Sequence, residues 1–307
     1  MNGAPDAATD RAVGALLGLA VGDAIGTTLE FSTRDARPPL TDMVGSGPFH
    51  LAPGQWTDDT AMALGLGYSL AERGAFDPRD CMSRFVNWYR WGAYSCTGTC
   101  FDIGWTTRTA LQSFEKGGEP FAGSTSPDSA GNGSLMRLSP VAIWGARRGE
   151  AEIVQVARDQ SRLTHGAHEC LAACEGYALL TARAILGARP PELLDASPLT
   201  APVTERLDAV FAGGWRDKDR AAISSSGYVV DSLEAALWCV DGTGSFEQAV
   251  LLAANLGDDA DTVAAITGQL AGAIYGASAI PESWRKRVAW GDEIEQLARA
   301  LFGVSAA

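Results

Sequence analysis

Residues 259–276 read DADTVAAITGQLAGAIYG, an acidic start followed by a mostly apolar stretch. Side chains of low polarity recur in this stretch at the spacing that places them on one face of an α-helix. They are Val263, Ile266, Thr267, Leu270 and Ile274. The segment therefore predicts a core helix that begins with two aspartates.

The same periodicity recurs along most of the chain, for example from Ile103 to Phe114 and from Leu233 to Val240. Alternating runs of β-branched residues bounded by turns are nearly absent, so the fold class is predicted to be all-α. Helices are expected over residues 10–24, 58–73, 78–92, 102–116, 134–148, 150–163, 167–187, 203–212, 230–240, 245–255, 260–276 and 284–302.

Two short acidic clusters lie far apart in the chain. They are Thr57-Asp58-Asp59 and Asp259-Ala260-Asp261-Thr262. They offer only oxygen ligands, which favours a hard cation such as Mg²⁺ or Mn²⁺ over Zn²⁺. Their four aspartates would balance two divalent ions. The alternative is simple helix capping, since Thr and Asp are common at helix N-termini. Because two clusters share this composition, metal binding is favoured.

The length of 307 residues would allow about two domains. If both clusters bind the same ions, however, the two ends of the chain must meet in one site. A single compact domain over residues 1–307 is therefore predicted, with residues 1–9 flexible. The net charge of −13 disfavours general binding to nucleic acids or to membrane surfaces, because both are polyanionic.

The run from Gly14 to Gly22 could pass for the apolar part of a signal peptide. It lacks the basic flank of such a peptide and is too short to span a bilayer, so it is read as a buried helix of a cytoplasmic protein. The six cysteines do not predict a disulfide scaffold. Zinc binding by Cys170 and Cys174 with His165 and His168 is conceivable, but reduced core cysteines are favoured.

Several motifs, in this order, resemble the ADP-ribosylglycohydrolase family and its dinitrogenase-reductase-activating branch over nearly the whole chain. They are Gly14 to Gly26, Glu30, Gln55-Trp56-Thr57-Asp58-Asp59-Thr60, Gly131-Asn132-Gly133-Ser134-Leu135-Met136-Arg137 and Leu256-Gly257-Asp258-Asp259-Ala260-Asp261-Thr262. The resemblance implies an orthogonal all-α bundle around a binuclear Mg²⁺ or Mn²⁺ site that removes ADP-ribose from modified targets.

The resemblance also assigns the metal ligands. It implies that Thr57, Asp58 and Asp59 form one part of the binding set and that Asp259, Asp261 and Thr262 form the other. Asp258 stands where the family usually has glycine, so either Asp258 or Asp259 could face the metal. Asp259 is expected to do so because it keeps the Asp-x-Asp-Thr spacing.

Two further carboxylates are candidate catalytic residues. An exposed surface glutamate would be the ordinary interpretation of Glu30, but its position matches a family glutamate near the metals and the scissile bond. Asp102 could cap a helix, or it could be an acid/base as proposed for the nitrogenase-activating branch. Which of the two transfers the proton is left open.

A set of residues is expected to contact the substrate. The turn at 131–134 could hold a phosphate on exposed amides, although glycine-rich turns are common. Tyr228 could stack on adenine or pack in the core. By resemblance the substrate-binding set is Gly131, Asn132, Gly133, Ser134, His165, Ser226, Gly227 and Tyr228.

The expected function is hydrolysis of the glycosidic bond between ADP-ribose and a protein side chain, with mono-ADP-ribosylated arginine as the favoured target. The expected partners are ADP-ribose and an ADP-ribosylated protein. Two alternatives stay open: a protein that binds ADP-ribose without turnover, and another two-metal hydrolase acting on a nucleotide or phosphoester.

Overall fold

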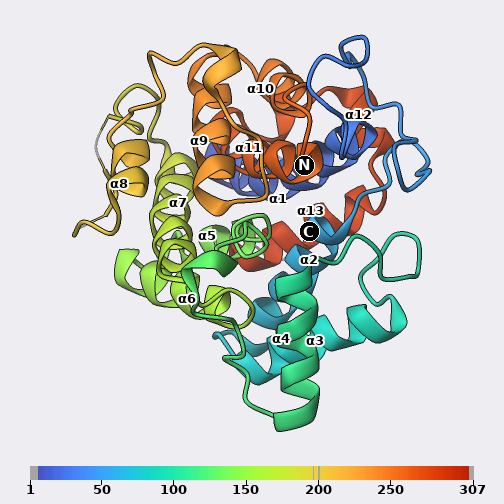
Figure 1. The fold of residues 1–307 in the computed structure, drawn as a ribbon, viewed down its shortest axis with the longest axis vertical. Coiled ribbons are helices and arrows are strands. Elements are labelled where there is room, and N and C mark those ends of the chain that lie inside the picture. The colour runs from blue at the N-terminus through green and yellow to red at the C-terminus, as the bar shows by residue number, and fades with distance from the viewer. Residues whose placement is uncertain (1–5, 196, 200, 304–307) are drawn as a thin grey trace.

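A computed structural model describes residues 6–195, 197–199 and 201–303. Within these ranges the chain forms thirteen α-helices and no strands, which confirms the predicted all-α class. The helices are α1 (Ala7–Gly26), α2 (Asp58–Arg73), α3 (Pro78–Trp91), α4 (Trp105–Gly117), α5 (Ser139–Gly145), α6 (Glu150–Arg162), α7 (His168–Leu186), α8 (Glu205–Phe211), α9 (Val229–Asp241), α10 (Phe246–Ala254), α11 (Ala260–Tyr275), α12 (Glu282–Arg287) and α13 (Gly291–Leu301). Figure 1 shows their arrangement.

Two expectations about helix boundaries were wrong. The helix expected over 134–148 is limited to α5, because residues 133–137 form turns. The helix expected over 284–302 is divided into α12 and α13, because Trp290 adopts a left-handed backbone conformation (φ 57°). The flexible segment expected at 1–9 lies partly outside the described residues, but Ala7 to Thr9 already belong to α1.

Helices α1 and α11 lie side by side and antiparallel, with their backbones in contact (Figure 1). A methyl group added to Gly14 would lie 2.3 Å from the carbonyl oxygen of Gly272, and one added to Gly18 would lie 2.3 Å from that of Gly268. Any side chain larger than hydrogen would therefore push the helices apart. The helical glycines of the sequence allow this close approach.

The α1–α11 contact brings distant parts of the chain together at one end of the pair. Gly26 at the end of α1 packs against the carbonyl oxygen of Ala260, the first residue of α11. Asp23 of α1 also bonds to the first turn of α2. The three segments that contain the acidic residues thus converge at one place.

Helix α1 is longer than the apolar run that was considered too short for a bilayer. Among the described residues, 7–29 are long and apolar enough to cross a membrane, but all of the apolar window is buried inside the protein. The expectation of a buried core helix is thereby confirmed.

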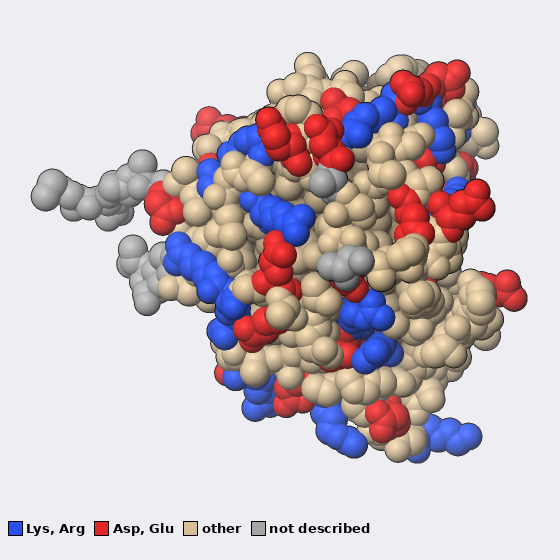
Figure 2. All heavy atoms as spheres, turned by 90° about the vertical axis from the view of Figure 1, so that its left-hand side faces the viewer, with Lys and Arg blue, Asp and Glu red and all other residues tan. Residues whose placement is uncertain are grey.

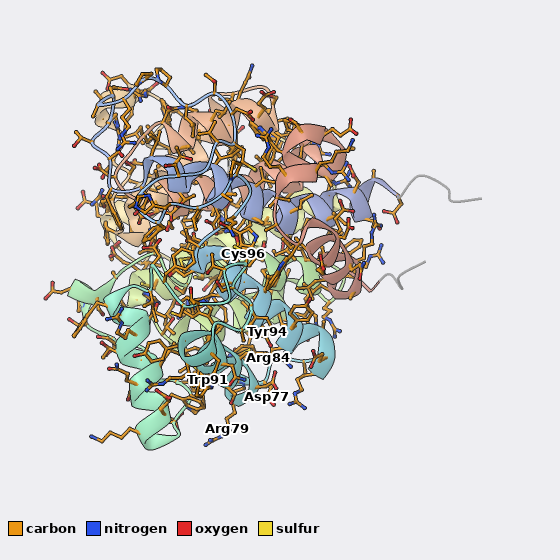
Figure 3. The ribbon with its side chains drawn as sticks, turned by 90° about the vertical axis from the view of Figure 1, so that its right-hand side faces the viewer. Asp77, Arg79, Arg84, Trp91, Tyr94 and Cys96 are labelled. Atoms are coloured by element: carbon orange, nitrogen blue, oxygen red, sulfur yellow. The ribbon has the colours of Figure 1, made fainter. Side chains whose placement is uncertain are left out.

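The helices that pack against this pair are α2, α5, α7, α9, α10, α12 and α13, while α3, α4, α6 and α8 lie farther out. Helices α6 and α7 lie on the side that Figure 2 presents, where Lys and Arg alternate with Asp and Glu. Ion pairs such as Arg158–Glu175 (2.7 Å) connect the two helices. On another side, Figure 3 shows Arg84 of α3 close to Tyr94, whose hydroxyl lies 2.9 Å from the guanidinium. Tyr94 and Cys96 belong to the loop that leads from α3 to α4.

Candidate metal centre and substrate cavity

The first acidic cluster opens α2, but Thr57 does not cap the helix with its own side chain. Asp23 of α1 caps it instead. One carboxylate oxygen of Asp23 accepts bonds from the amide (2.9 Å) and the hydroxyl (3.0 Å) of Thr57. The other accepts from the amide (3.0 Å) and the hydroxyl (2.6 Å) of Thr60. Asp58 and Asp59 are therefore not needed as caps.

The second cluster opens α11, and this helix is likewise capped by a carboxylate from another segment. Asp259 precedes the helix without capping it. Oε2 of Glu30 accepts bonds from the backbone amides of Ala260 (2.8 Å) and Asp261 (3.4 Å). Glu30 is buried, so the ordinary interpretation as an exposed surface glutamate does not apply. Local capping does not explain either cluster.

Oxygen atoms from both clusters lie in contact. Carboxylate oxygens of Glu30, Asp259 and Asp261 all lie within 4.8 Å of one another, the spacing of a group that could hold a metal ion. The hydroxyl of Thr57 lies 3.3 Å from Asp59 and 3.2 Å from Asp261. The hydroxyl of Thr262 lies 3.4 Å from Asp59. The two triplets predicted as metal ligands thus meet in one place.

Burial and like charge dominate the electrostatics of this centre. Burial, followed by the charge of Asp261, raises the pKa of Asp259 to about 7 and holds the pKa of Asp58 well above its ordinary value. Burial and the charges of Asp23 and Asp261 do the same to the pKa of Asp59. Each shift follows from desolvation and like charge, the conditions that a cation relieves.

The donor set fits hard cations. All candidate ligands are carboxylate or hydroxyl oxygens, the type that Mg²⁺ and Mn²⁺ prefer. Oδ1 of Asp59 is buried and has no hydrogen-bond partner among the described residues. A buried charged oxygen without a partner is costly, and a bound cation would remove that cost.

The two neighbouring aspartates of the second cluster face different surroundings. Asp259 belongs to the group that could hold a metal, and its Oδ2 accepts a bond from Nδ2 of Asn132 (2.7 Å). Asp258 is exposed and lies at the rim, where its backbone pairs with Phe31 and Ser32. Both residues line the cavity, but among the described residues Asp259, and not Asp258, belongs to the group that could hold a metal.

Asp102 lies near the same centre but not as a helix cap. Helix α4 begins three residues later, with Gly104 at its N-cap position and no capping side chain. Burial, then the charges of Asp261 and Asp58, raises the pKa of Asp102 to about 11. Its backbone is left-handed (φ 58°), a conformation that costs a non-glycine residue free energy and is often found at functional sites.

A cavity of about 750 Å³ opens above the acidic centre. This volume lies within the ordinary range for small-molecule sites. Most of the residues expected to bind substrate line it: Gly131, Asn132, Gly133, His165, Ser226 and Gly227. Glu30, Asp58, Asp102, Asp259, Asp261 and Thr262 also line it, whereas Thr57 and Asp59 lie behind them.

Two residues expected to bind substrate point elsewhere. Ser134 is buried and shares a hydrogen bond with the hydroxyl of Ser161 (2.8 Å). The hydroxyl of Tyr228 donates to Glu169 (2.6 Å), and its ring lies beneath the guanidinium of Arg206. Neither side chain is part of the cavity wall. A role in substrate binding for these two would have to be indirect.

Sequence reasoning missed other residues of this site. Asp23 was not among the predicted site residues, yet an acidic residue inside a buried glycine-rich helix is itself an unusual signal. Phe31 and Trp105 line the cavity and are 68% and 79% exposed. Large exposed aromatic side chains beside a pocket are a signal that only the structure provides.

The cysteines do not form a zinc site in the described part of the chain. All six are free thiols. The thiol of Cys96 lies 3.4 Å from both the amide and the carbonyl of Trp56, and that of Cys170 donates to the carbonyl oxygen of Gly131 (3.3 Å). The expectation of reduced cysteines in the protein interior fits this arrangement.

A model of the family described as ADP-ribosylglycohydrolase matches residues 4–307. The chain belongs to the ADP-ribosylglycohydrolase family. The resemblance inferred from the sequence motifs is thereby confirmed.

The similarity to individual proteins extends over nearly the whole of this chain. The chain is 48% identical to "ADP-ribosylarginine hydrolase Tri1" of Pseudomonas putida (strain GB-1), with 97% of this chain and 79% of that protein covered. It is 35% identical to "ADP-ribosyl-[dinitrogen reductase] glycohydrolase" of Rhodospirillum rubrum, with 91% and 90% covered. A solved "ADP-ribosylglycohydrolase-related protein complex" matches with a TM-score of 0.86 at 40% identity, covering 97% of this chain and 99% of that one.

Proposed function

We propose that this protein is a hydrolase that removes ADP-ribose from modified arginine side chains with two divalent cations, Mg²⁺ or Mn²⁺. Family membership supports a glycohydrolase, and the Pseudomonas putida relative is named an ADP-ribosylarginine hydrolase. The observation that carries the proposal is the buried, oxygen-only acidic centre at the base of a cavity large enough for a nucleotide sugar. We also propose a cytoplasmic location, as expected from the sequence.

The cations would be held by the two triplets, Thr57, Asp58 and Asp59 with Asp259, Asp261 and Thr262. When bound, such cations orient ribose hydroxyls and stabilise charge that develops on substrate oxygens. Asn132 supports this set from the cavity side, since its amide donates both to Asp259 and to the hydroxyl of Ser232. A ligand held in this way keeps its orientation when substrate enters.

The reaction breaks the bond between the anomeric carbon of the ribose and a guanidinium nitrogen, and forms a bond between that carbon and the oxygen of water. Water loses one proton, and the departing nitrogen gains one. Two carboxylates that line the cavity, Glu30 and Asp102, are available for these transfers.

The surroundings of the two carboxylates suggest a division of labour. Glu30 is fixed through the amides of Ala260 and Asp261, which suits a group that orients water or contributes to the metal centre. Among the described residues, no backbone amide holds Asp102 in this way, so its carboxyl group is the freer proton carrier. General acid–base catalysis requires such a group within hydrogen-bond reach of the reacting atoms.

The test is release of free ADP-ribose from a mono-ADP-ribosylated arginine peptide, with Mg²⁺ or Mn²⁺ in turn. Serine-linked, phosphate-linked and polymeric ADP-ribose complete the panel. We expect turnover of the arginine conjugate, with both products identified by mass spectrometry. A protein that binds ADP-ribose but releases it from no conjugate would be a binding protein. Formation of AMP or inorganic phosphate would instead indicate another two-metal hydrolase.

A further inference from the structure

Arg137 is wholly buried yet has no carboxylate partner within ion-pair distance among the described residues. Its guanidinium donates to the side chain (3.0 Å) and the carbonyl oxygen (2.9 Å) of Gln160, and it lies over the ring of Phe85 at 4.7 Å. Burying an arginine without a counter-charge is costly. Nη1 lies 3.8 Å from Sδ of Met62. One further hydrogen bond indicates what this residue does.

That contact is with Thr164. Nη2 of Arg137 lies 2.9 Å from the hydroxyl oxygen of Thr164, and that oxygen lies 2.8 Å from Nδ1 of His165. A guanidinium can only donate, so the threonine oxygen accepts from it. The single hydroxyl hydrogen of Thr164 is then left for one acceptor.

Only one arrangement of hydrogen atoms gives a partner to each of the three groups, the guanidinium of Arg137, the hydroxyl of Thr164 and Nδ1 of His165. If the hydroxyl donates to Nδ1, all three groups have partners. If Nδ1 carried the hydrogen, the hydroxyl hydrogen of Thr164 would have no acceptor in a fully buried place. An unsatisfied buried donor costs about 1–3 kcal/mol. Nδ1 is therefore the acceptor.

The imidazole also stays neutral. Burial, followed by the nearby charge of Arg137, lowers the pKa of His165 to about 3. A neutral ring carries one hydrogen, and with Nδ1 acting as acceptor that hydrogen must be on Nε2.

Nε2 lies beside Gly131 and Gly133, two residues of the cavity wall. His165 lines the cavity, and Nε2 bonds to no acceptor of the described residues. A methyl group added to Gly133 would lie 2.7 Å from Cε1 and 3.1 Å from Nε2, so this glycine leaves the room that the ring occupies. The amide of His165 donates to the carbonyl oxygen of Ser161 (2.7 Å), which fixes the backbone below the ring.

We propose that Arg137 and Thr164 are positioning residues that hold His165 in its neutral Nε2–H form, so that the imidazole presents one hydrogen-bond donor to an oxygen of the bound nucleotide sugar. In this form Nε2 has no free lone pair, so His165 is neither a metal ligand nor a general base. The choice of ligand rests on the proposed function, whereas the state of the ring does not.

The state of the ring can be measured directly. The chain has three histidines, at positions 50, 165 and 168, so ¹⁵N-labelled histidine gives few signals, and His165→Gln assigns one set. In the whole protein with Mg²⁺ we expect His165 to show a protonated Nε2 and an unprotonated Nδ1. Both should stay unchanged over the pH range in which ordinary histidines titrate. A protonated Nδ1 in the wild type would overturn the proposal.

Thr164→Val and Thr164→Ser form a matched pair. The valine variant loses the donor to Nδ1, so we expect a mixture of ring tautomers and about tenfold weaker binding of ADP-ribose by calorimetry. The serine variant keeps the hydroxyl and should behave as the wild type. An unchanged tautomer and affinity in Thr164→Val would overturn the positioning role.

Arg137→Gln removes the fixed donor and should likewise release both tautomers. If that variant does not fold, the wild-type spectrum and the Thr164 pair decide the matter without it. Absence of ADP-ribose binding by a wild type that shows the expected tautomer would contradict the proposed function, while the positioning of His165 would stand.

Discussion

The N-terminal ends of α2 and α11 carry the same residue types, yet the carboxylates that cap them lie in different surroundings. Asp23 caps α2 from within the protein interior, where it accepts four hydrogen bonds from two threonines. Glu30 caps α11 through two amides, and it also lines the cavity. When a carboxylate from another segment caps a helix, the aspartates at the start of that helix are free to bind a ligand. Of the two caps, only Glu30 can also contact substrate, because it lines the cavity and Asp23 does not.

The largest expected effect tests whether both helix ends contribute to one centre. Asp58→Ala and Asp259→Ala should each lower the rate of ADP-ribose release by on the order of 10³-fold, because each removes a metal ligand and its charge. Steady-state kinetics over a range of Mg²⁺ concentrations measures this. Asp292→Asn is the control, an exposed aspartate in the first turn of α13. Loss of activity in only one of the two variants would show that the ends do not share a centre.

The next effect concerns protein stability and the start of α2, which the buried Asp23 caps. Asp23→Ala should lower the free energy of unfolding by about 3 kcal/mol, because it leaves two buried backbone amides and the hydroxyl of Thr60 without their acceptor. Asp23→Asn keeps one acceptor oxygen and should lose less. Urea denaturation in the presence of a chelator separates this effect from metal binding. Equal stability of all three proteins would show that Asp23 does not hold the start of α2.

Glu30 caps the start of α11 and lines the cavity, so its removal should give the opposite result. Glu30→Ala should change the free energy of unfolding by less than about 1 kcal/mol, because water in the cavity can reach the amides of Ala260 and Asp261. Its rate of ADP-ribose release should fall by about 100-fold. Denaturation and kinetics of the same preparation test both parts. A variant that is strongly destabilised but fully active would reverse the comparison between Glu30 and Asp23.

The smallest expected effect is on the pH dependence of stability. Because the folded pKa of His165, about 3, lies below the ordinary value, the unfolded chain binds the proton more readily. The stabilisation is complete above the unfolded pKa and is lost as the pH falls toward the folded one. Between pH 7 and pH 5 the free energy of unfolding of the wild type should fall by about 2 kcal/mol relative to that of His165→Gln. If the free energies of unfolding of the wild type and His165→Gln, measured by denaturation, differed by the same amount at pH 7 and pH 5, the neutral ring would be contradicted.

Much of the centre could be predicted because its ligands form two contiguous clusters. Local sequence shows that Asp58 and Asp59 begin an apolar helix, and the same holds for Asp261 and Thr262. The all-α fold followed from helical periodicity in the same way. These are local properties, which periodicity and residue chemistry express directly.

The remaining features depend on packing between distant segments. Asp23 acts on Thr57 and Thr60 only because the α1–α11 contact fixes where α1 ends. Ser134 follows a glycine-rich turn, but the hydroxyl of Ser161 draws its side chain inward. Trp290 divides the last predicted helix, and its ring packs edge-on against Trp56 at 5.3 Å. The local sequence marks Asp23 as unusual but does not reveal its partners, and it gives no sign of the contacts of Ser134 and Trp290.

The close packing of α1 on α11 also has a consequence for how the protein is made. A ribosome needs about ten to forty seconds to proceed from Asp59 to Asp259 at ordinary rates of synthesis. During that interval the glycine-lined face of α1 has no partner helix, and half of the acidic ligands do not yet exist. The growing chain must therefore pass through a long stage with an uncovered apolar surface, and the enzyme centre forms only after the start of α11 has been synthesised.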